Sequence, residues 1–230
     1  MPVQPAPHDT ASSASQRRGY ETALLAALVP LALAASYSIG HLDIPVARLV
    51  TRYLYASREW LHFTSSIPDA LLILVVCVAA GSYALFRYRV ARHGIDAPAI
   101  MYETLAVAAP AAFLAKSLLK FAFGRINTRE WLLAPQEYGF HWFNGDARFS
   151  GFPSGHMVVF VALCAVLWRF HPRWRPACLA LLLLLALALI ATNYHFLSDV
   201  IVGAYVGLVV EAGTRRAVER AYRGPSLMKR

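Results

Sequence analysis

The sequence is poor in charge. Charged residues make up 15% of its 230 positions, and only 13 residues are acidic. So little charge cannot cover a soluble fold, and a 58% hydrophobic content with a mean hydropathy of +0.47 excludes ordinary soluble composition. We therefore expect an integral membrane protein.

Cysteine is also scarce. The three cysteines, Cys77, Cys164 and Cys178, all fall in apolar runs, where a thiol packs as a small hydrophobic side chain. Neither a disulfide framework nor a cysteine metal site is expected from them. The sequence also lacks an internal repeat or a low-complexity tract, and no second domain or cofactor is predicted.

Long apolar runs are the main positive feature. A bilayer core requires about 20 apolar residues for one crossing. Six runs approach this length, at roughly 21–40, 66–86, 99–122, 154–170, 177–194 and 196–214. Because lipid cannot hydrogen-bond a bare backbone, the runs should be helices packed together. The predicted fold is all-α, a six-transmembrane-helix bundle.

The ends of the chain differ in composition from the bundle. Residues 1–18, rich in Ala, Ser, Pro and Gln, are predicted to be a disordered cytoplasmic tail. The membrane domain is expected over 19–216, and a basic cytoplasmic tail over 217–230. The first apolar run lacks a small-residue cleavage pattern, so it is interpreted as a retained helix.

The basic excess indicates topology. A net charge of +9 could suggest a nucleic-acid partner, but with both termini cytoplasmic the inside segments hold 14 of the 22 basic residues. This asymmetry follows the positive-inside rule, so no nucleic acid is expected. The partner expected instead is the bilayer.

Cationic and amide side chains gather at the outer end of the third run. Lys116 and Lys120 lie one helical turn apart and share a face. Either lysine alone is explained by an ammonium that reaches the headgroups. Arg125, Asn127 and Arg129 follow where the helix should leave the membrane. A donor cluster of this kind is suited to binding phosphate.

The segment GFPSGHM, residues 151–157, stands directly before the fourth run. Pro153 and Ser154 are ordinary residues for a helix start. Gly155 additionally lets a ligand approach the backbone, and His156 adds a titratable proton donor. Since the amides and dipole of a helix N-terminus favour anions, we predict an anion site here.

His195 and Asp199 lie four residues apart in NYHFLSDVIVG, between the fifth and sixth runs. One helical turn would let Asp199 accept a hydrogen bond from one ring nitrogen of His195, which orients the other nitrogen and makes it more basic. A lone histidine at a membrane interface is usually structural. An aspartate at the start of a membrane-spanning segment, however, is energetically unfavourable unless it has a partner. The pair is a candidate catalytic site.

Together these stretches resemble the motifs of the type-2 phosphatidic acid phosphatase superfamily. Its membrane members are six-helix lipid phosphatases related to vanadium haloperoxidases. The motif Pro-Ser-Gly-His is complete at 153–156, the third motif keeps His195 and Asp199, and the first keeps Lys120. The resemblance covers about residues 66–214.

Two arginines of the family pattern are missing. The family's first motif is Lys, six residues, Arg-Pro, and its third begins with Ser-Arg. The residues at the missing positions are Asn127, Thr128, Ala188 and Leu189. Arg125 stands where some versions of the first motif carry an additional arginine. Arg125, Arg129 or both are candidates to supply the lost charge.

The resemblance implies metal-independent hydrolysis of a lipid phosphate monoester or pyrophosphate. His195, oriented by Asp199, would form a phosphohistidine, and His156 would protonate the leaving alcohol. The resemblance places this site at the outer interface of a membrane, and we expect a bacterial inner membrane with the site facing the periplasm. The residues expected to hold the phosphate are Lys120, Arg125, Asn127, Ser154 and Gly155.

Two alternatives stay open. A lipid headgroup phosphotransferase would use the same histidines, and the missing arginines favour a catalytically silent protein that binds lipid phosphates. The retained histidine pair favours an enzyme, because binding alone needs no nucleophile and acid. A metal site is not expected, since no cysteine or third carboxylate accompanies His195 and Asp199 at ligand spacing.

The loop over 123–153 is unusually aromatic for a polar connection. Aromatic rings are stable at a bilayer interface, which we expect to explain most of them. The rings are those of Trp131, Tyr138, Phe140, Trp142, Phe143 and Phe149.

Overall fold

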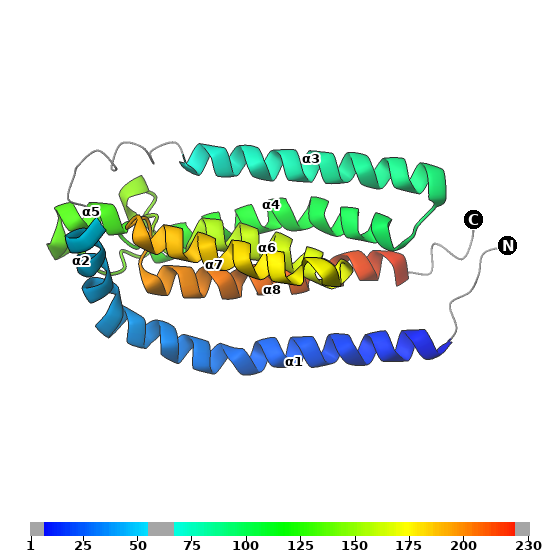
Figure 1. The fold of residues 1–230 in the computed structure, drawn as a ribbon, viewed down its shortest axis with the longest axis horizontal. Coiled ribbons are helices and arrows are strands. Elements are labelled where there is room, and N and C mark those ends of the chain that lie inside the picture. Colours follow the sequence, from blue (N-terminus) through cyan, green and yellow to red (C-terminus); the bar gives the residue numbers. More distant parts are fainter. Residues whose placement is uncertain (1–6, 55–66, 224–230) are drawn as a thin grey trace.

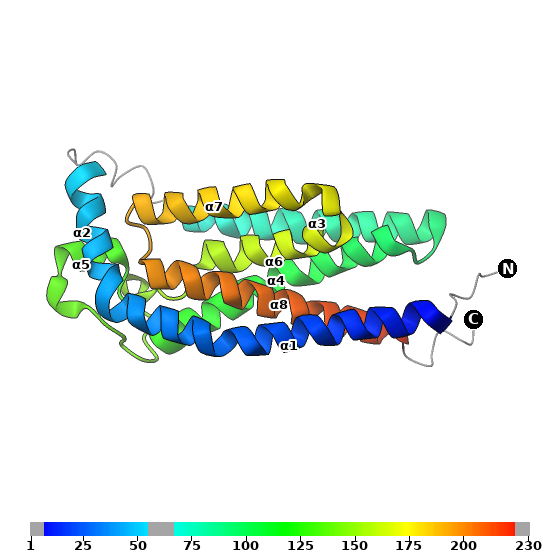
Figure 2. The same cartoon turned by 60° about the horizontal axis from the view of Figure 1, so that its bottom comes forward.

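The computed structural model describes residues 7–54 and 67–223. Within these ranges the chain forms helices and turns, with one isolated bridge between Arg125 and Phe140. Long helices run side by side along the molecule (Figure 1), and a second view shows the same alignment (Figure 2). The all-α prediction is confirmed.

Each of the six predicted runs coincides largely with a helix. Five helical segments of the described residues are long and apolar enough to cross a membrane, and α6 is shorter, at 16 residues. The helices are α1 (Pro7–Tyr37), α3 (Ile67–His93), α4 (Ala97–Phe123), α6 (Gly155–Phe170), α7 (Arg175–Ala191) and α8 (Leu197–Arg223).

The terminal helices extend into the segments expected to be tails. α1 begins at Pro7, within the predicted disordered segment 1–18, and α8 continues to Arg223, within the predicted tail 217–230. The helical main chain there differs from the prediction of tails. The remaining residues of both segments lie outside the described part of the chain.

Helix α6 lies at the centre of the bundle. It packs against both α4 and α8, and nine of its 16 residues are buried. Val158, Val159 and Ala162 meet Ala109 and Ala112 of α4 in an apolar cluster. A helix that is apolar on all sides is stable only when it is enclosed in this way. Its N-terminus is consequently held in a fixed position.

Two glycines bring α8 into close contact with α6. A Cβ atom added at Gly203 would lie 2.7 Å from the Ser154 carbonyl oxygen, and one at Gly207 would lie 2.7 Å from that of Val158. Only a residue without a side chain fits at these distances. The contact sets the start of α8 beside the start of α6, where the Ser154 amide donates to the Asp199 carbonyl at 3.0 Å.

Several short elements were not predicted. A π-helical segment (Ser38–Leu42) joins α1 to α2 (Asp43–Leu54), and α5 (Thr128–Leu133) follows α4. Both α2 and α5 lie at the end of the bundle opposite the start of α1 and the end of α8 (Figure 1). We call this the capped end, and the opposite end the terminal end. Three 3-10 turns complete the structure, at Pro135–Glu137, Ala147–Phe149 and Pro172–Trp174.

Candidate functional site

A left-handed glycine directs the chain into the capped end. Gly124 ends α4 with φ of 53°, and a Cβ atom there would lie 1.9 Å from the His141 carbonyl oxygen. Glycine is required by both the conformation and the space. The His141 amide donates to the Gly124 carbonyl at 2.9 Å, which folds the loop back over the next residue, Arg125.

The Arg125 guanidinium lies between two carboxylates. Its Nη1 donates to Asp199 Oδ1 at 2.6 Å, its Nη2 donates to Asp43 Oδ2 at 2.7 Å, and all three side chains are fully buried. Nη1 also donates to Ser198 Oγ, and Nη2 to the Tyr138 hydroxyl. Burial opposes the charge of Arg125, but Asp199 and Asp43 outweigh it and raise the pKa of Arg125 above its usual value. Arg125 is therefore a permanent cation that fixes Asp199.

This arrangement differs from the expectation that Arg125 holds phosphate. Both terminal nitrogens of the guanidinium donate to protein groups, because a buried charge is stable only when it is paired and hydrogen-bonded. Aromatic rings complete its surroundings within 6.0 Å of the guanidinium carbon. These rings belong to Tyr138, Phe140, Phe152 and Phe196.

The aromatic loop is only partly at the surface. Trp131 and Phe149 are buried in a second apolar cluster. Trp142 and Phe143 are 60% and 72% exposed, so of the six rings these two have the surface that an interfacial position requires. The two remaining rings, Tyr138 and Phe140, pack on the Arg125 guanidinium, so part of the loop encloses that charge.

Asp199, in the first turn of α8, lies behind His195, which precedes the helix. Its Oδ2 is 3.6 Å from His195 Nδ1 and accepts the Phe196 amide at 2.9 Å. The first distance is longer than an ordinary hydrogen bond, although catalytic contacts often shorten once substrate is bound. Burial lowers the pKa of His195 below its usual value, and Asp199 opposes this shift only partly. The ring is thereby kept neutral, which is the form a nucleophile requires.

The two predicted histidines lie close together. The ring centroids of His156 and His195 are 6.5 Å apart, and the ring of Tyr194 lies 5.6 Å from the first and 5.1 Å from the second. His156 stands in the first turn of α6, and both histidines are buried. A small group that enters between the rings can contact both.

Lysine side chains lie against the start of α6. A Cβ atom at Gly155 would lie 2.6 Å from Lys116 Cδ and 3.5 Å from Lys120 Cε, so both stems pass beside this residue. Lys120 Nζ donates to the Ser150 carbonyl, and Ser154 is the N-cap of the helix. The structure therefore gathers two lysine stems and a helix N-terminus near the histidines, while the Lys116 ammonium lies 4.0 Å from the centre of the Phe113 ring.

Two further candidate phosphate ligands donate to backbone carbonyls, although the Arg129 guanidinium also lies 5.2 Å from the centre of the Tyr194 ring. Asn127 donates to the Ala147 carbonyl at 2.9 Å and ties down the loop. Arg129 donates to the Thr192 carbonyl at 3.0 Å, at the C-terminus of α7, where a cation is favourable. Leu189 is buried in an apolar cluster. The residues at the two missing arginine positions thus bring no charge to the histidines.

Asp43 is a residue of the site that the sequence analysis missed. Besides pairing with Arg125, it accepts the Ser198 amide at 3.0 Å and the Ser198 hydroxyl. Asn193 makes a similar link, because its side chain donates to Thr51 of α2 at 2.9 Å. The sequence did contain a signal for this residue: Asp43 stands just after the first apolar run, where an acidic side chain needs a partner.

The described residues contain no group of three or more His, Cys, Asp or Glu side chains that could hold a metal ion. Asp199 is paired with the Arg125 guanidinium, and its Oδ2 lies 3.6 Å from His195 Nδ1. The donor set of the capped end therefore fits a phosphate anion better than a metal cation.

Comparison with known proteins agrees with this geometry. Residues 101–223 match the family described as the PAP2 superfamily. Over 97 residues the chain is 35% identical to a Lipid A 1-phosphatase of Rhizobium etli and 34% identical to a Lipid A 1-phosphatase of Rhizobium johnstonii. Each match covers 41% of this chain, but only 40% and 38% of the respective relative. No solved structure matches the chain.

Proposed function

Since the chain belongs to the PAP2 superfamily, we propose that it is a membrane phosphatase that hydrolyses a lipid phosphate through a phosphohistidine intermediate. The observation that carries this proposal is the meeting of His156 and His195 at the start of α6, with Asp199 behind His195. A protein that only binds lipid phosphates needs a cationic cradle but has no use for this pair. The neutral state of His195 also suits attack on phosphorus.

The phosphate lies, in this proposal, at the N-terminus of α6. Lys120, the Ser154 hydroxyl and the amides at Gly155 meet its charge, and Lys116, whose stem passes beside Gly155, assists by turning its ammonium from the Phe113 ring toward the phosphate. These lysines take the place of the missing motif arginines. Arg125 acts through Asp199 as a positioning residue and does not touch the substrate.

The chemistry proceeds in two steps. Asp199 lies on the Nδ1 side of His195, so Nε2 attacks phosphorus in line. A P–N bond forms, the P–O bond to the lipid breaks, and His156 gives its proton to the leaving oxygen. Water then attacks the phosphohistidine while His156 takes a proton from it. The P–N bond breaks, and inorganic phosphate leaves.

The names of the relatives suggest the first substrate to test, the 1-phosphate of lipid A. Phosphatidate, phosphatidylglycerol phosphate and a polyprenyl pyrophosphate complete a panel, with release of inorganic phosphate as the measurement. His195→Ala should abolish release from the preferred lipid, whereas His141→Ala, which alters an exposed loop histidine, should retain it. Equal activity in the two variants would contradict the proposal.

The same assay separates the alternatives. Transfer of radiolabelled phosphate to an added lipid alcohol, with little free phosphate, would identify a headgroup phosphotransferase. Saturable binding of a lipid phosphate with no turnover would identify a silent binding protein. Phosphate release dependent on His195 supports the hydrolase.

We further propose that the capped end faces the periplasm of a bacterial inner membrane. The basic residues near the terminal end support this orientation. A cysteine introduced at the exposed Gly145, in a Cys77→Ala background, should react with a membrane-impermeant reagent from the periplasmic side. Labelling only from the cytoplasmic side would reverse the orientation.

A further inference from the structure

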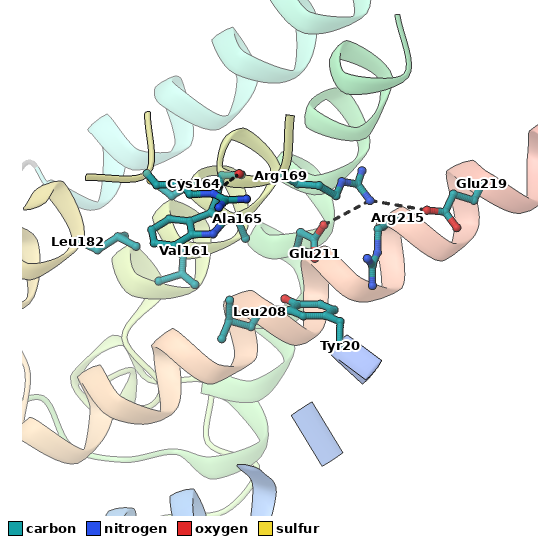
Figure 3. Close-up of a pocket in the computed structure, with 12 residues that line it drawn as sticks. Tyr20, Val161, Cys164, Ala165, Arg169, Leu182, Leu208, Glu211, Arg215 and Glu219 are labelled. Atoms are coloured by element: carbon teal, nitrogen blue, oxygen red, sulfur yellow. Dashed lines mark hydrogen bonds and ion pairs between the residues drawn. The ribbon is translucent and has the colours of Figure 1, made fainter. Parts of the chain in front are cut away.

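A second polar site lies toward the terminal end of the bundle. A cavity of about 640 Å³ is lined mainly by α6, α7 and α8, with Tyr20 of α1 at its lower edge (Figure 3). It lies farther along α6 than His156, toward the C-terminus of that helix. None of its lining residues belongs to the site described above. The inner wall is apolar and includes Val161, Leu182 and Leu208.

Charged side chains collect at one side of this cavity. Arg169 lies 3.9 Å from Glu211 and 3.7 Å from Glu219, so one cation bridges two carboxylates. Arg175 and Arg215 also line the cavity. Three arginines against two glutamates leave one positive charge in excess (3 − 2 = +1).

Within the described part of the chain, Arg215 is the buried cavity arginine with an unused terminal nitrogen, whereas Arg169 lacks a hydrogen-bond partner only at Nε. The residue is only 7% exposed, and its Nε and Nη2 atoms have no hydrogen-bond partner among the residues that the structure describes. Its guanidinium carbon lies 4.8 Å from the centre of the Tyr20 ring, a contact that uses none of these donors. Buried donors without acceptors are destabilising, and an arginine at this depth needs an anion.

We propose that this cavity binds the phosphate headgroup of an anionic phospholipid, with Arg215 as the buried anchor. Basic pockets between membrane helices are suited to such headgroups. The apolar wall favours a lipid over a free phosphate ion, because it offers an acyl chain a surface of Val161, Leu182 and Leu208. Trp168 and Arg175 at the rim fit the headgroup level, where Trp is stable and an exposed arginine reaches the lipid phosphates.

The test uses the purified full-length chain after delipidation, incubated with phosphatidylglycerol or phosphatidylcholine and analysed by native mass spectrometry. We expect preferential retention of phosphatidylglycerol. Arg215→Gln should weaken this retention by roughly fivefold, the effect of removing about one lipid-facing cation. Arg216→Gln is the matched control, because Arg216 is the next residue of α8, pairs with Glu21 and does not line the cavity.

A second variant covers the case in which Arg215→Gln fails to fold. Ala165→Phe fills the cavity without changing its charge and should also reduce retention of phosphatidylglycerol. Glycerol 3-phosphate tests for a soluble ligand and should not displace the lipid. The proposal is overturned by equal retention of the two lipids, by undiminished retention in both Arg215→Gln and Ala165→Phe, or by full displacement with glycerol 3-phosphate. None of these measurements depends on phosphatase activity.

Discussion

The two ends of the bundle each bury an arginine close to acidic side chains, but they use it differently. At the capped end, both terminal nitrogens of Arg125 donate to neighbouring side chains, with carboxylates at 2.6 and 2.7 Å. At the terminal end, Arg169 pairs with the carboxylates, and Nε and Nη2 of Arg215 have no acceptor among the described residues. An arginine whose two terminal nitrogens are both bonded to protein groups fixes those groups, whereas one with an unused terminal nitrogen can receive an anion.

The contacts of Arg125 suit a positioning residue and not a phosphate ligand. Arg125 is paired with Asp199, and Asp199 lies behind His195, so in the proposed reaction the arginine acts by positioning Asp199. The proposed phosphate site then needs other cations, and the stems of Lys116 and Lys120 pass beside Gly155. Variants at the capped end can test each of these links.

The largest effect is expected from the histidines of the capped end. His195→Ala should lower the rate of lipid phosphate hydrolysis by about 10⁴-fold or more, because loss of a nucleophile removes the covalent path. It should also abolish a phosphoenzyme trapped by rapid quenching. A phosphoenzyme that persists in this variant would assign the nucleophile to another residue.

His156→Ala should depend on the leaving group. Loss of a general acid costs about 10²–10⁴-fold with a lipid alcohol, which needs a proton, and much less with an activated aryl phosphate, which does not. The phosphoenzyme should still form from the aryl phosphate. The measurement is kcat/KM for both substrates, and equal losses on the two would exclude His156 as the acid.

Asp43→Asn should break the pairing of Arg125 with one of its carboxylates. Removal of one partner from a buried ion pair destabilises by roughly 3 kcal/mol, so thermal unfolding should occur at a lower temperature. Because Asp43 acts through Arg125 and Asp199, kcat should fall while KM changes little. Asp146→Asn, at an exposed loop residue, is the control and should leave unfolding and kcat unchanged. Equal unfolding temperatures for the two variants would show that Arg125 does not depend on Asp43.

This chain of contacts also shows what the sequence could predict. Bilayer thickness fixes the length of an apolar helix, so the six runs predicted the main helices, and local spacing predicted His195 beside Asp199. The role of Arg125 was not accessible, because its partners lie 74 and 82 residues away. Helices α2 and α5, with 12 and 6 residues, are too short to give an apolar run of membrane length.

The pH dependence of the reaction should reveal how Lys120 acts on His195. Burial is the main cause of the lowered pKa of His195, and the Lys120 ammonium lowers it further. The neutral ring is the reactive form, so activity is present above this pKa and is lost as the pH falls through it. The acid limb of kcat/KM in the native enzyme should accordingly lie below about pH 6.5, the usual value for histidine.

Lys120→Met removes a positive charge that opposes the imidazolium, so the pKa of His195 should rise and the acid limb should move to higher pH. Weaker phosphate binding lowers kcat/KM at every pH, but it does not change the pH at which the acid limb falls. Arg148→Gln removes an exposed loop cation and should leave the limb in place. A limb that stays fixed in Lys120→Met would show that this ammonium does not act on His195.

The smallest effect is expected from Gly155→Ala. The added Cβ would lie 2.6 Å from Lys116 Cδ, which must move, and 3.5 Å from Lys120 Cε, an ordinary contact. Since the lysine stem is flexible, the fold should survive, and the displaced ammonium should raise KM by a few-fold, about the effect of one exposed charge on a phosphate. Gly213→Ala is the matched control, because nothing lies within 4 Å of its added Cβ and alanine favours a helix. If KM rises equally in both variants, the lysine at Gly155 is not the cause; if it rises in Gly155→Ala alone, Lys116 belongs with Lys120 among the groups that bind the phosphate.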